Sequence, residues 1–135
     1  MRPGRFQEFV IGLAEADHTA ITAKTLAETG ESSVPCGFAI TVADISRWGV
    51  VGQLPDGAKH TDFEDTPVHG DPIKPQDPPQ ATDPPEQWLA ALLAQSGSAE
   101  IAEVERWSTR EEARPGYFGV TVRFHNAARV FVRLL

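Results

Sequence analysis

The chain has 135 residues, of which 41% are hydrophobic, and a formal net charge of −7. This length fits one domain. The single cysteine, Cys36, excludes an intramolecular disulfide and a cysteine-rich metal site, and the negative charge disfavours bulk attraction to nucleic acid or an anionic membrane. The basic residues 1–5 are not followed by the apolar run of a secretion signal or membrane span, so we expect a cytoplasmic protein.

The first elements expected are a helix and a β-hairpin. Residues 5–17 predict an amphipathic helix, because their apolar residues recur with helical spacing: Phe6, Phe9, Val10, Leu13 and Ala16. Residues 20–27 are β-permissive and predict a first strand. Residues 38–42 alternate apolar and polar side chains, which predicts a half-buried strand. A loop at 45–47 would lead to its hairpin partner at 48–54, pairing residue 42 with 50, 40 with 52 and 38 with 54.

The middle of the chain, residues 55–86, predicts an acidic linker. It holds eight of the eleven prolines, two basic and eight acidic side chains, and proline interrupts both helices and central strands. Its imidazole and carboxylate groups could in principle bind a divalent metal: His60, Asp62, Glu64, Asp65, His69 and Asp71. Their spacing matches no zinc or calcium signature, so we predict no metal site and no cofactor.

The last part of the chain predicts a second helix and three strands. Asp83 is placed to cap the helix, with Pro84 as its first residue and Glu86 completing a capping box. Strands are expected at 101–108, 117–124 and 129–135. A three-residue turn at 125–127 would pair 122 with 130, bury Phe118, Val120 and Val122, and turn these side chains outward: Tyr117, Thr121, Arg123, Arg129, Phe131, Arg133 and Leu135. A shift of one residue would bury three arginines instead.

A repeated segment relates the two ends of the chain. Residues 35–42 and 115–122 both read P-x-x-F-[AG]-[IV]-T-V, and the same offset of eighty residues pairs Val51 with Phe131. Each half is too small to bury a core alone. The repeat therefore predicts an α+β fold of two pseudo-symmetric αβββ repeats that share one antiparallel sheet packed by two helices. The first repeat would be residues 1–54, the linker 55–86 and the second repeat 87–135, all within a single domain.

This pattern of helix, P-x-x-F-x-[IV]-T-V hairpin and proline-rich spacer resembles small uncharacterised proteins of GC-rich actinobacterial genomes. The resemblance covers most of the chain and implies no activity. In architecture alone the chain is also similar to type III secretion chaperones, small acidic α+β proteins that dimerise and hold a client segment, although no motif residue carries over.

The functional prediction follows from the uncovered side of the sheet. Two helices can cover one face of a six-stranded sheet, so the other face is expected to be exposed to solvent or covered by a partner. We expect a non-catalytic module that binds proteins, as a homodimer through this face or the last strand, with these binding residues: Tyr117, Arg123, Arg129, Phe131, Arg133 and Leu135. The first alternative is nucleic-acid binding, because arginines beside aromatic rings are typical of sheet-based RNA binders. A further possibility is that the acidic linker lies across the arginines and neutralises them.

The second alternative is a small-ligand site or an enzyme in a cleft between the repeats. Cys36 is a candidate nucleophile, but its repeat counterpart is Gly116, which favours a structural thiol. His18 and His125 have no acid or base partner visible in the sequence. The chain also lacks the nucleophile-elbow, phosphate-loop, H-E-x-x-H and dinucleotide motifs, so we favour a protein that is not an enzyme.

Overall fold

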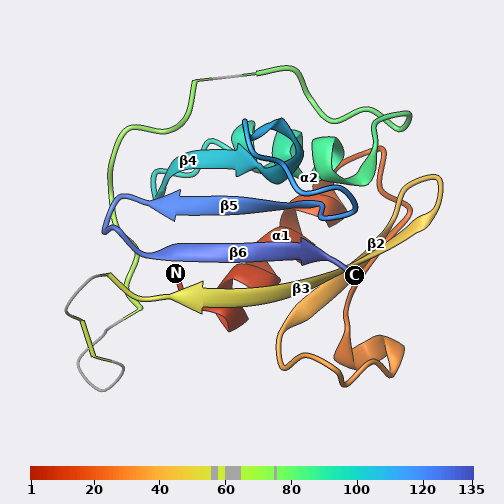
Figure 1. Cartoon of the computed structure of the whole chain (residues 1–135), viewed down its shortest axis with the longest axis horizontal. Helices are drawn as coiled ribbons and strands as arrows, with labels where there is room; N and C mark the ends of the chain where they lie inside the picture. The colour runs from red at the N-terminus through yellow and green to blue at the C-terminus, as the bar shows by residue number, and fades with distance from the viewer. Residues whose placement is uncertain (56–57, 60–64, 75) are drawn as a thin grey trace.

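The computed structural model describes residues 1–55, 58–59, 65–74 and 76–135, and these form two α-helices, two short 3₁₀ helices and a six-stranded antiparallel sheet (Figure 1). The strands lie in the order β1-β2-β3-β6-β5-β4. The expected α+β fold is confirmed. The elements in chain order are α1 (Pro3–Ala16), β1 (Thr22–Thr25), η1 (Ala27–Thr29), β2 (Gly37–Thr41), β3 (Ile45–Gln53), α2 (Pro85–Ala94), β4 (Ile101–Arg106), η2 (Trp107–Thr109), β5 (Gly119–Phe124) and β6 (Arg129–Leu134).

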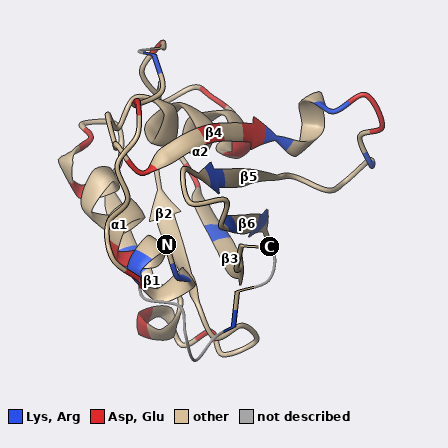
Figure 2. Ribbon diagram, turned by 90° about the vertical axis from the view of Figure 1, so that its left-hand side faces the viewer, with Lys and Arg blue, Asp and Glu red and all other residues tan. Residues whose placement is uncertain are grey.

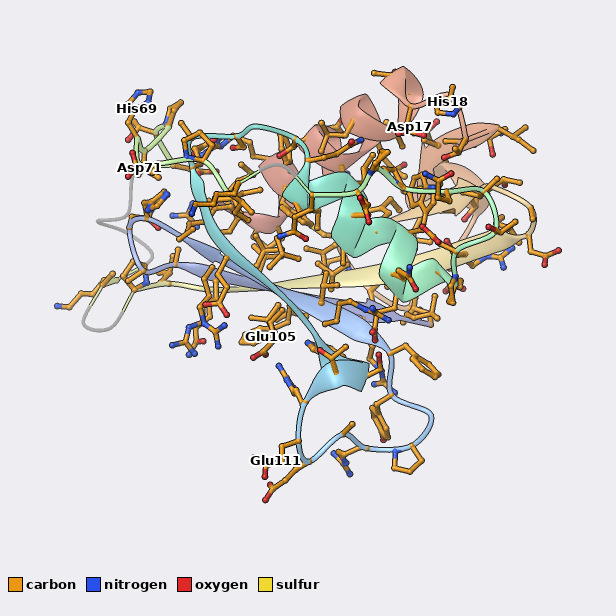
Figure 3. All side chains as sticks on the ribbon, turned by 90° about the horizontal axis from the view of Figure 1, so that it is seen from above. Asp17, His18, His69, Asp71, Glu105 and Glu111 are labelled. Carbon is orange, nitrogen blue, oxygen red and sulfur yellow. The ribbon has the colours of Figure 1, made fainter. Side chains whose placement is uncertain are left out.

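Both α-helices pack on one side of the sheet, as the view from above shows (Figure 3). α1 lies against β1, β2 and β3, and α2 against β4 and β5. The core between them consists of apolar side chains of both helices and of the strand faces beneath: Phe6, Val10, Ala14, Phe38, Ile40, Trp48, Val50, Trp88, Leu89, Leu92, Leu93, Val120, Val122, Phe124, Val130 and Val132. The stripe of α1 differs from the expected one at its end, where Ala14 is buried and Ala16 is exposed.

The second hairpin has the predicted register. Val120 pairs with Val132 and Val122 with Val130, and all four side chains are fully buried. Ala127, with φ 68°, is the turn residue in the left-handed region. The strand begins at Gly119, later than expected, and the preceding Phe118 is 43% exposed rather than buried.

The first hairpin does not have the predicted register. Phe38 pairs with Trp48 and Ile40 with Ser46, so the turn lies at residues 42–44 and β3 begins at Ile45. The predicted partner of Phe38 was residue 54, six positions further along. A shift of six is even, so it leaves the same side chains on the buried face, and the hydrophobic pattern alone cannot tell the two registers apart.

Strands β3 and β6 pair at the centre of the sheet and so join the N-terminal and C-terminal halves of the chain. Their register sets Val51 opposite Phe131 and Val50 opposite Val132. β6 is bonded to β3 on one side and to β5 on the other. The last strand therefore offers no free edge to a second copy, and one of the two expected routes to a homodimer is wrong.

The last two residues of the expected linker, Pro85 and Glu86, begin α2; the other described linker residues form neither helix nor strand and run past β4 and α2 (Figure 1). The Gly70 N–H donates to the Ala99 carbonyl at 2.8 Å, and a Cβ on Gly70 would lie 2.4 Å from the His125 ring, so this close approach requires glycine. The Arg5 guanidinium of α1 joins the linker carboxylate Asp65 at 2.8 Å to Glu100 at 2.9 Å. These contacts fasten the linker to the folded body.

Candidate binding face

The candidate functional surface is the side of the sheet that faces away from α1 and α2, which we call the outer face. Successive strand residues alternate between the two sides. Val51 is 62% exposed on the outer face, whereas its neighbour Val50 is 2% exposed on the helix side. The same alternation turns outward the odd-numbered residues of the central strands: Arg47, Gly49, Val51, Gln53, Thr121, Arg123, Arg129, Phe131 and Arg133.

One end of the outer face is covered by residues 107–118, which connect β4 to β5 and project from this side of the sheet (Figure 3). We call this segment the arm. The Trp107 indole Nε1–H donates to the Thr121 hydroxyl at 2.9 Å, and Arg110 lies over the Trp107 ring at 5.5 Å. Thr121 is consequently buried. A Cβ on Gly119 would lie 2.7 Å from the Trp107 ring, so glycine permits this close packing.

The base of the arm is held by a buried carboxylate on α2. Glu86 is 2% exposed and accepts hydrogen bonds from the Arg106 Nε–H at 3.1 Å, the Gly119 N–H at 3.0 Å and both the N–H and the hydroxyl of Ser108. It thereby joins the two ends of the arm. The predicted capping box is wrong, because α2 begins at Pro85 and has no side-chain cap.

A second loop, residues 26–36 between β1 and β2, covers the opposite end of the outer face. Leu26 is buried over Gly37, where a Cβ would lie 2.5 Å from Leu26 Cδ1. Val34 lies 3.5 Å from the position that a Cβ on Gly49 would take, as does Leu135. Further along β3, Val51 remains 62% exposed, so neither loop covers that part of the face.

Three of the predicted binding residues meet at one end of β6. Two guanidinium groups pack against the Tyr117 ring, Arg114 at 4.7 Å and Arg133 at 4.9 Å from its centroid. Such cation–π contacts orient the arginines. Leu135 follows directly after β6 and is 54% exposed. Tyr117 thus belongs to the arm rather than to the strand in which it was expected.

Arg123 and Arg129 face each other at the other end of β5 and β6. Arg123 lies 3.3 Å from Glu103 and 4.0 Å from Glu105, so acidic residues of β4 neutralise it (Figure 2). Within the described part of the chain, Arg129 and Arg133 form no ion pair with a carboxylate. In this they differ from Arg123, which has two carboxylate partners.

The structure brings five residues together in the middle of the outer face, on a surface that we call the central strip: Val51, Arg129, Phe131, Arg133 and Leu135. Phe131, half-buried, lies in the middle, opposite Val51 on β3. The binding residues expected from the sequence did not include Val51. The strip combines exposed apolar side chains with two arginines, which suits contact with a mixed apolar and acidic surface.

No group of three or more His, Cys, Asp or Glu side chains in the described residues could hold a metal ion. His60, Asp62 and Glu64 of the predicted linker cluster lie outside the described residues. Asp65 binds Arg5, and His125 lies 3.0 Å from the Asp71 carbonyl oxygen. Cys36 is half-buried. The described linker residues bind Arg5 and the β4–β5 end of the sheet instead of lying across the outer arginines.

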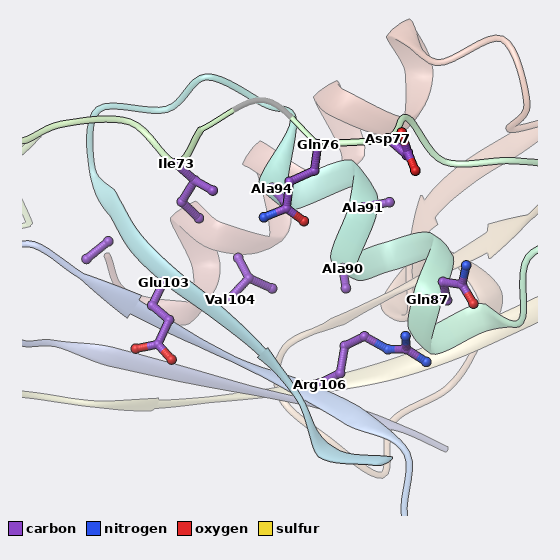
Figure 4. A pocket seen from close by; sticks show the side chains of 11 residues that line it. Ile73, Gln76, Asp77, Gln87, Ala90, Ala91, Ala94, Glu103, Val104 and Arg106 are labelled. Carbon is purple, nitrogen blue, oxygen red and sulfur yellow. The ribbon is translucent and has the colours of Figure 1, made fainter. Parts of the chain in front are cut away.

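A cavity of about 400 Å³ lies between α2, β4 and the linker, on the helix side of the sheet (Figure 4). It is bordered by alanines of α2, by Val104 of β4 and by Ile73 of the linker. This cavity does not lie between the two expected repeats, where the second alternative placed a ligand or an active site.

Comparison of the chain with protein-family models, with curated proteins and with solved structures gives no match. Neither α-helix in the described part of the chain has the length and hydropathy that crossing a membrane requires.

Proposed function

We propose that the chain is a non-catalytic, cytoplasmic protein-binding module whose central strip binds an acidic segment of a partner protein. The observation that carries the proposal is the exposure of Val51 and Leu135 beside Arg129 and Arg133 on the side that no α-helix covers. Apolar side chains lose contact with water when a partner covers them. Arginines that have no carboxylate partner in the described residues favour carboxylates on the bound segment.

Charge favours an acidic partner over a homodimer formed face to face. Two copies stacked through the outer face, about the central Val51 and Phe131, would bring the arginines of both central strips close together. Like charges at an interface weaken association. The homodimer expected from the sequence is therefore the alternative that the experiment below separates from the main proposal.

The geometry around Tyr117 argues against base stacking. Sheet-based RNA binders stack bases on exposed aromatic faces, whereas the Tyr117 ring already has Arg114 and Arg133 packed against it. The remaining aromatic side chain of the central strip, Phe131, is half-buried. The net charge of −7 further weakens attraction to a phosphate backbone.

We also propose that the two αβββ halves arose by duplication and share one core. In support, each half runs in the order helix and three strands. The β3–β6 register pairs Val51 with Phe131, the two residues that the sequence repeat aligns, so a twofold axis through this pair would relate the central strands. The unequal registers of the two hairpins then record divergence after duplication.

The proposal is tested by binding of short fluorescein-labelled peptides measured by anisotropy. A peptide of alternating glutamate and leucine is expected to bind the wild-type chain more tightly than one of alternating lysine and leucine, with affinity that falls as salt rises. The double variant Arg129→Glu with Arg133→Glu is expected to weaken binding of the acidic peptide by about tenfold or more.

The matched control is Lys24→Glu with Lys74→Glu, which changes the net charge equally at exposed positions away from the central strip. It is expected to leave the acidic peptide's affinity unchanged. Equal effects of both double variants, or equal affinity for the basic peptide, would contradict the proposal. Binding of a single-stranded oligonucleotide alone would favour the nucleic-acid alternative, and a dimer in sedimentation equilibrium that Val51→Glu dissociates would favour the homodimer.

A further inference from the structure

Strand β4 forms one edge of the sheet, and no described strand pairs with its far side. Phe124 N–H donates to the Ala128 carbonyl in the β5–β6 hairpin, so even-numbered residues of β5 bond β6 and odd-numbered residues bond β4. The β4 partners of these odd-numbered residues are Glu103 and Glu105. Because the N–H and C=O of one strand residue point to the same side, Val104 directs both groups away from β5, toward the open edge.

The cavity of about 400 Å³ lies beside this edge (Figure 4). Its α2 wall consists of the small side chains of Ala90, Ala91 and Ala94, while Ile73 borders it from the linker. Because these side chains are small, they leave space between the helix and the strand edge. An extended segment in this space would bond β4 through its backbone and set alternate side chains against α2, which is the geometry of strand addition.

Charged side chains around the edge indicate what this segment carries. Glu103 and Glu105 lie on the outer side of β4, where Arg123 lies 3.3 Å from Glu103 and Arg110 lies 2.6 Å from Glu105, and the Glu103 side chain remains 57% exposed. Asp77, on the cavity rim, forms no ion pair within the described part of the chain. Residues of an added strand that lie opposite Glu103 and Glu105 are two positions apart, so both point to the outer side. Basic side chains at these alternate positions would gain opposite-charge pairs.

We propose that an extended segment of a partner protein, alternating basic and small apolar residues, adds to β4 as a further strand and occupies this cavity. A second copy of β4 does not suit the place, because pairing about Val104 would bring the Glu103 and Glu105 side chains of both copies together. The β-bulge between Ile101 and Glu103, an ordinary protection of sheet edges, leaves residues 103–106 in regular register. This site is independent of the central strip.

The experiment uses a short labelled peptide of alternating lysine and alanine as its probe, titrated into the full chain. Val104→Pro removes the N–H at the open edge without touching the β4–β5 bonds, since proline is tolerated on an edge strand where its missing N–H faces solvent. We expect this variant to weaken binding by about tenfold or more. Val104→Ala keeps the N–H but loses most of the same side chain, so it is the reference for the backbone effect, and Val104→Pro is expected to bind the peptide about tenfold more weakly than Val104→Ala.

Two further measurements keep the test decisive if Val104→Pro does not fold. An otherwise identical peptide, N-methylated on alternate residues, cannot pair with a strand and is expected to lose binding. Amide hydrogen exchange at Val104 is expected to be fast in the free chain and to slow by about tenfold or more when the peptide is added. Unchanged exchange at Val104, or equal binding of the N-methylated peptide, would overturn the proposal, as would equal binding of an alternating glutamate and alanine peptide.

Discussion

Val50 and Val51 are neighbours on β3, yet the first is 2% exposed under the helices and the second 62% exposed on the outer face. Along β6 the same contrast separates buried Val130 and Val132 from outward-pointing Phe131. The helix side of these strands carries the packing that stabilises the fold. Exposed residues of the outer side, such as Val51, contribute little to that packing, so substitutions of them should change binding while leaving the fold intact.

The largest expected difference in the free energy of unfolding is between variants that remove a carboxylate on each side of the sheet. Glu86→Ala would leave the Ser108 hydroxyl, the Gly119 N–H and Arg106 without their acceptor in a buried site. We expect it to lower the free energy of unfolding by about 3–5 kcal/mol, as in other broken buried ion pairs. Urea unfolding followed by circular dichroism measures this effect.

Glu103→Ala is the matched carboxylate on the outer side, where Glu103 is 57% exposed beside Arg123. An exposed ion pair contributes little, so a change of about 0.5 kcal/mol or less is expected. Equal losses in the two variants would mean that Glu86 does not anchor the arm. Hydrogen exchange at the Gly119 amide supplies an independent readout, because release of the arm exposes that N–H.

The two neighbouring valines give the next largest difference. Val50→Ala removes buried methyl groups and is expected to lower the free energy of unfolding by about 2 kcal/mol. Val51→Ala removes the same atoms from the solvent side, where a change of about 0.5 kcal/mol or less is expected. Both are measured by the same urea titration. A large loss in Val51→Ala would show that the outer face is covered in solution by the chain or by another copy.

This contrast also explains which parts of the structure the sequence could predict. Side-chain alternation identified the helix-side residues of the second hairpin, because a one-residue shift there would have buried arginines. It failed for the first hairpin, where the observed and expected partners of Phe38, residues 48 and 54, differ by an even number. The pattern in the chain fixes which face a residue occupies, but not how far one strand slides along the next.

The candidate site was predictable only in part for a related reason. Arg129, Phe131 and Arg133 were placed outward correctly, since their strand lies in a regular register. Glu86 gave no recognisable signal, because its hydrogen bonds join residues twenty or more positions apart. The neutralisation of Arg123 by Glu103 depends on β4 lying beside β5, and strand order is a property of the whole fold.

The smallest expected difference in the free energy of unfolding is between variants of two arginines, each of which lies near two carboxylates. Arg5, on the helix side, binds Asp65 and Glu100, whose side chains are 17% and 14% exposed, whereas Arg123 binds more exposed glutamates on the outer face. Arg5→Met is expected to lower the free energy of unfolding by about 1 kcal/mol at neutral pH. Arg123→Met is expected to change it by about half as much or less, because solvent screens its partners.

Acidification should reduce the stability that Arg5 contributes. The hydrogen bonds from Arg5 hold the pKa of Glu100 below its ordinary 4.5. Burial raises the pKa of Asp65, but the hydrogen bonds from Arg5 and from the Arg2 N–H more than offset this and leave it below 3.8. A carboxylate whose pKa is lowered by folding stabilises the fold above its unfolded-state pKa and loses this contribution as the pH falls through the folded-state value. Urea titrations at about pH 7 and about pH 3 should therefore show a smaller separation between wild type and Arg5→Met at the lower pH; an equal separation at both would mean that Arg5 stabilises the chain by packing rather than by charge.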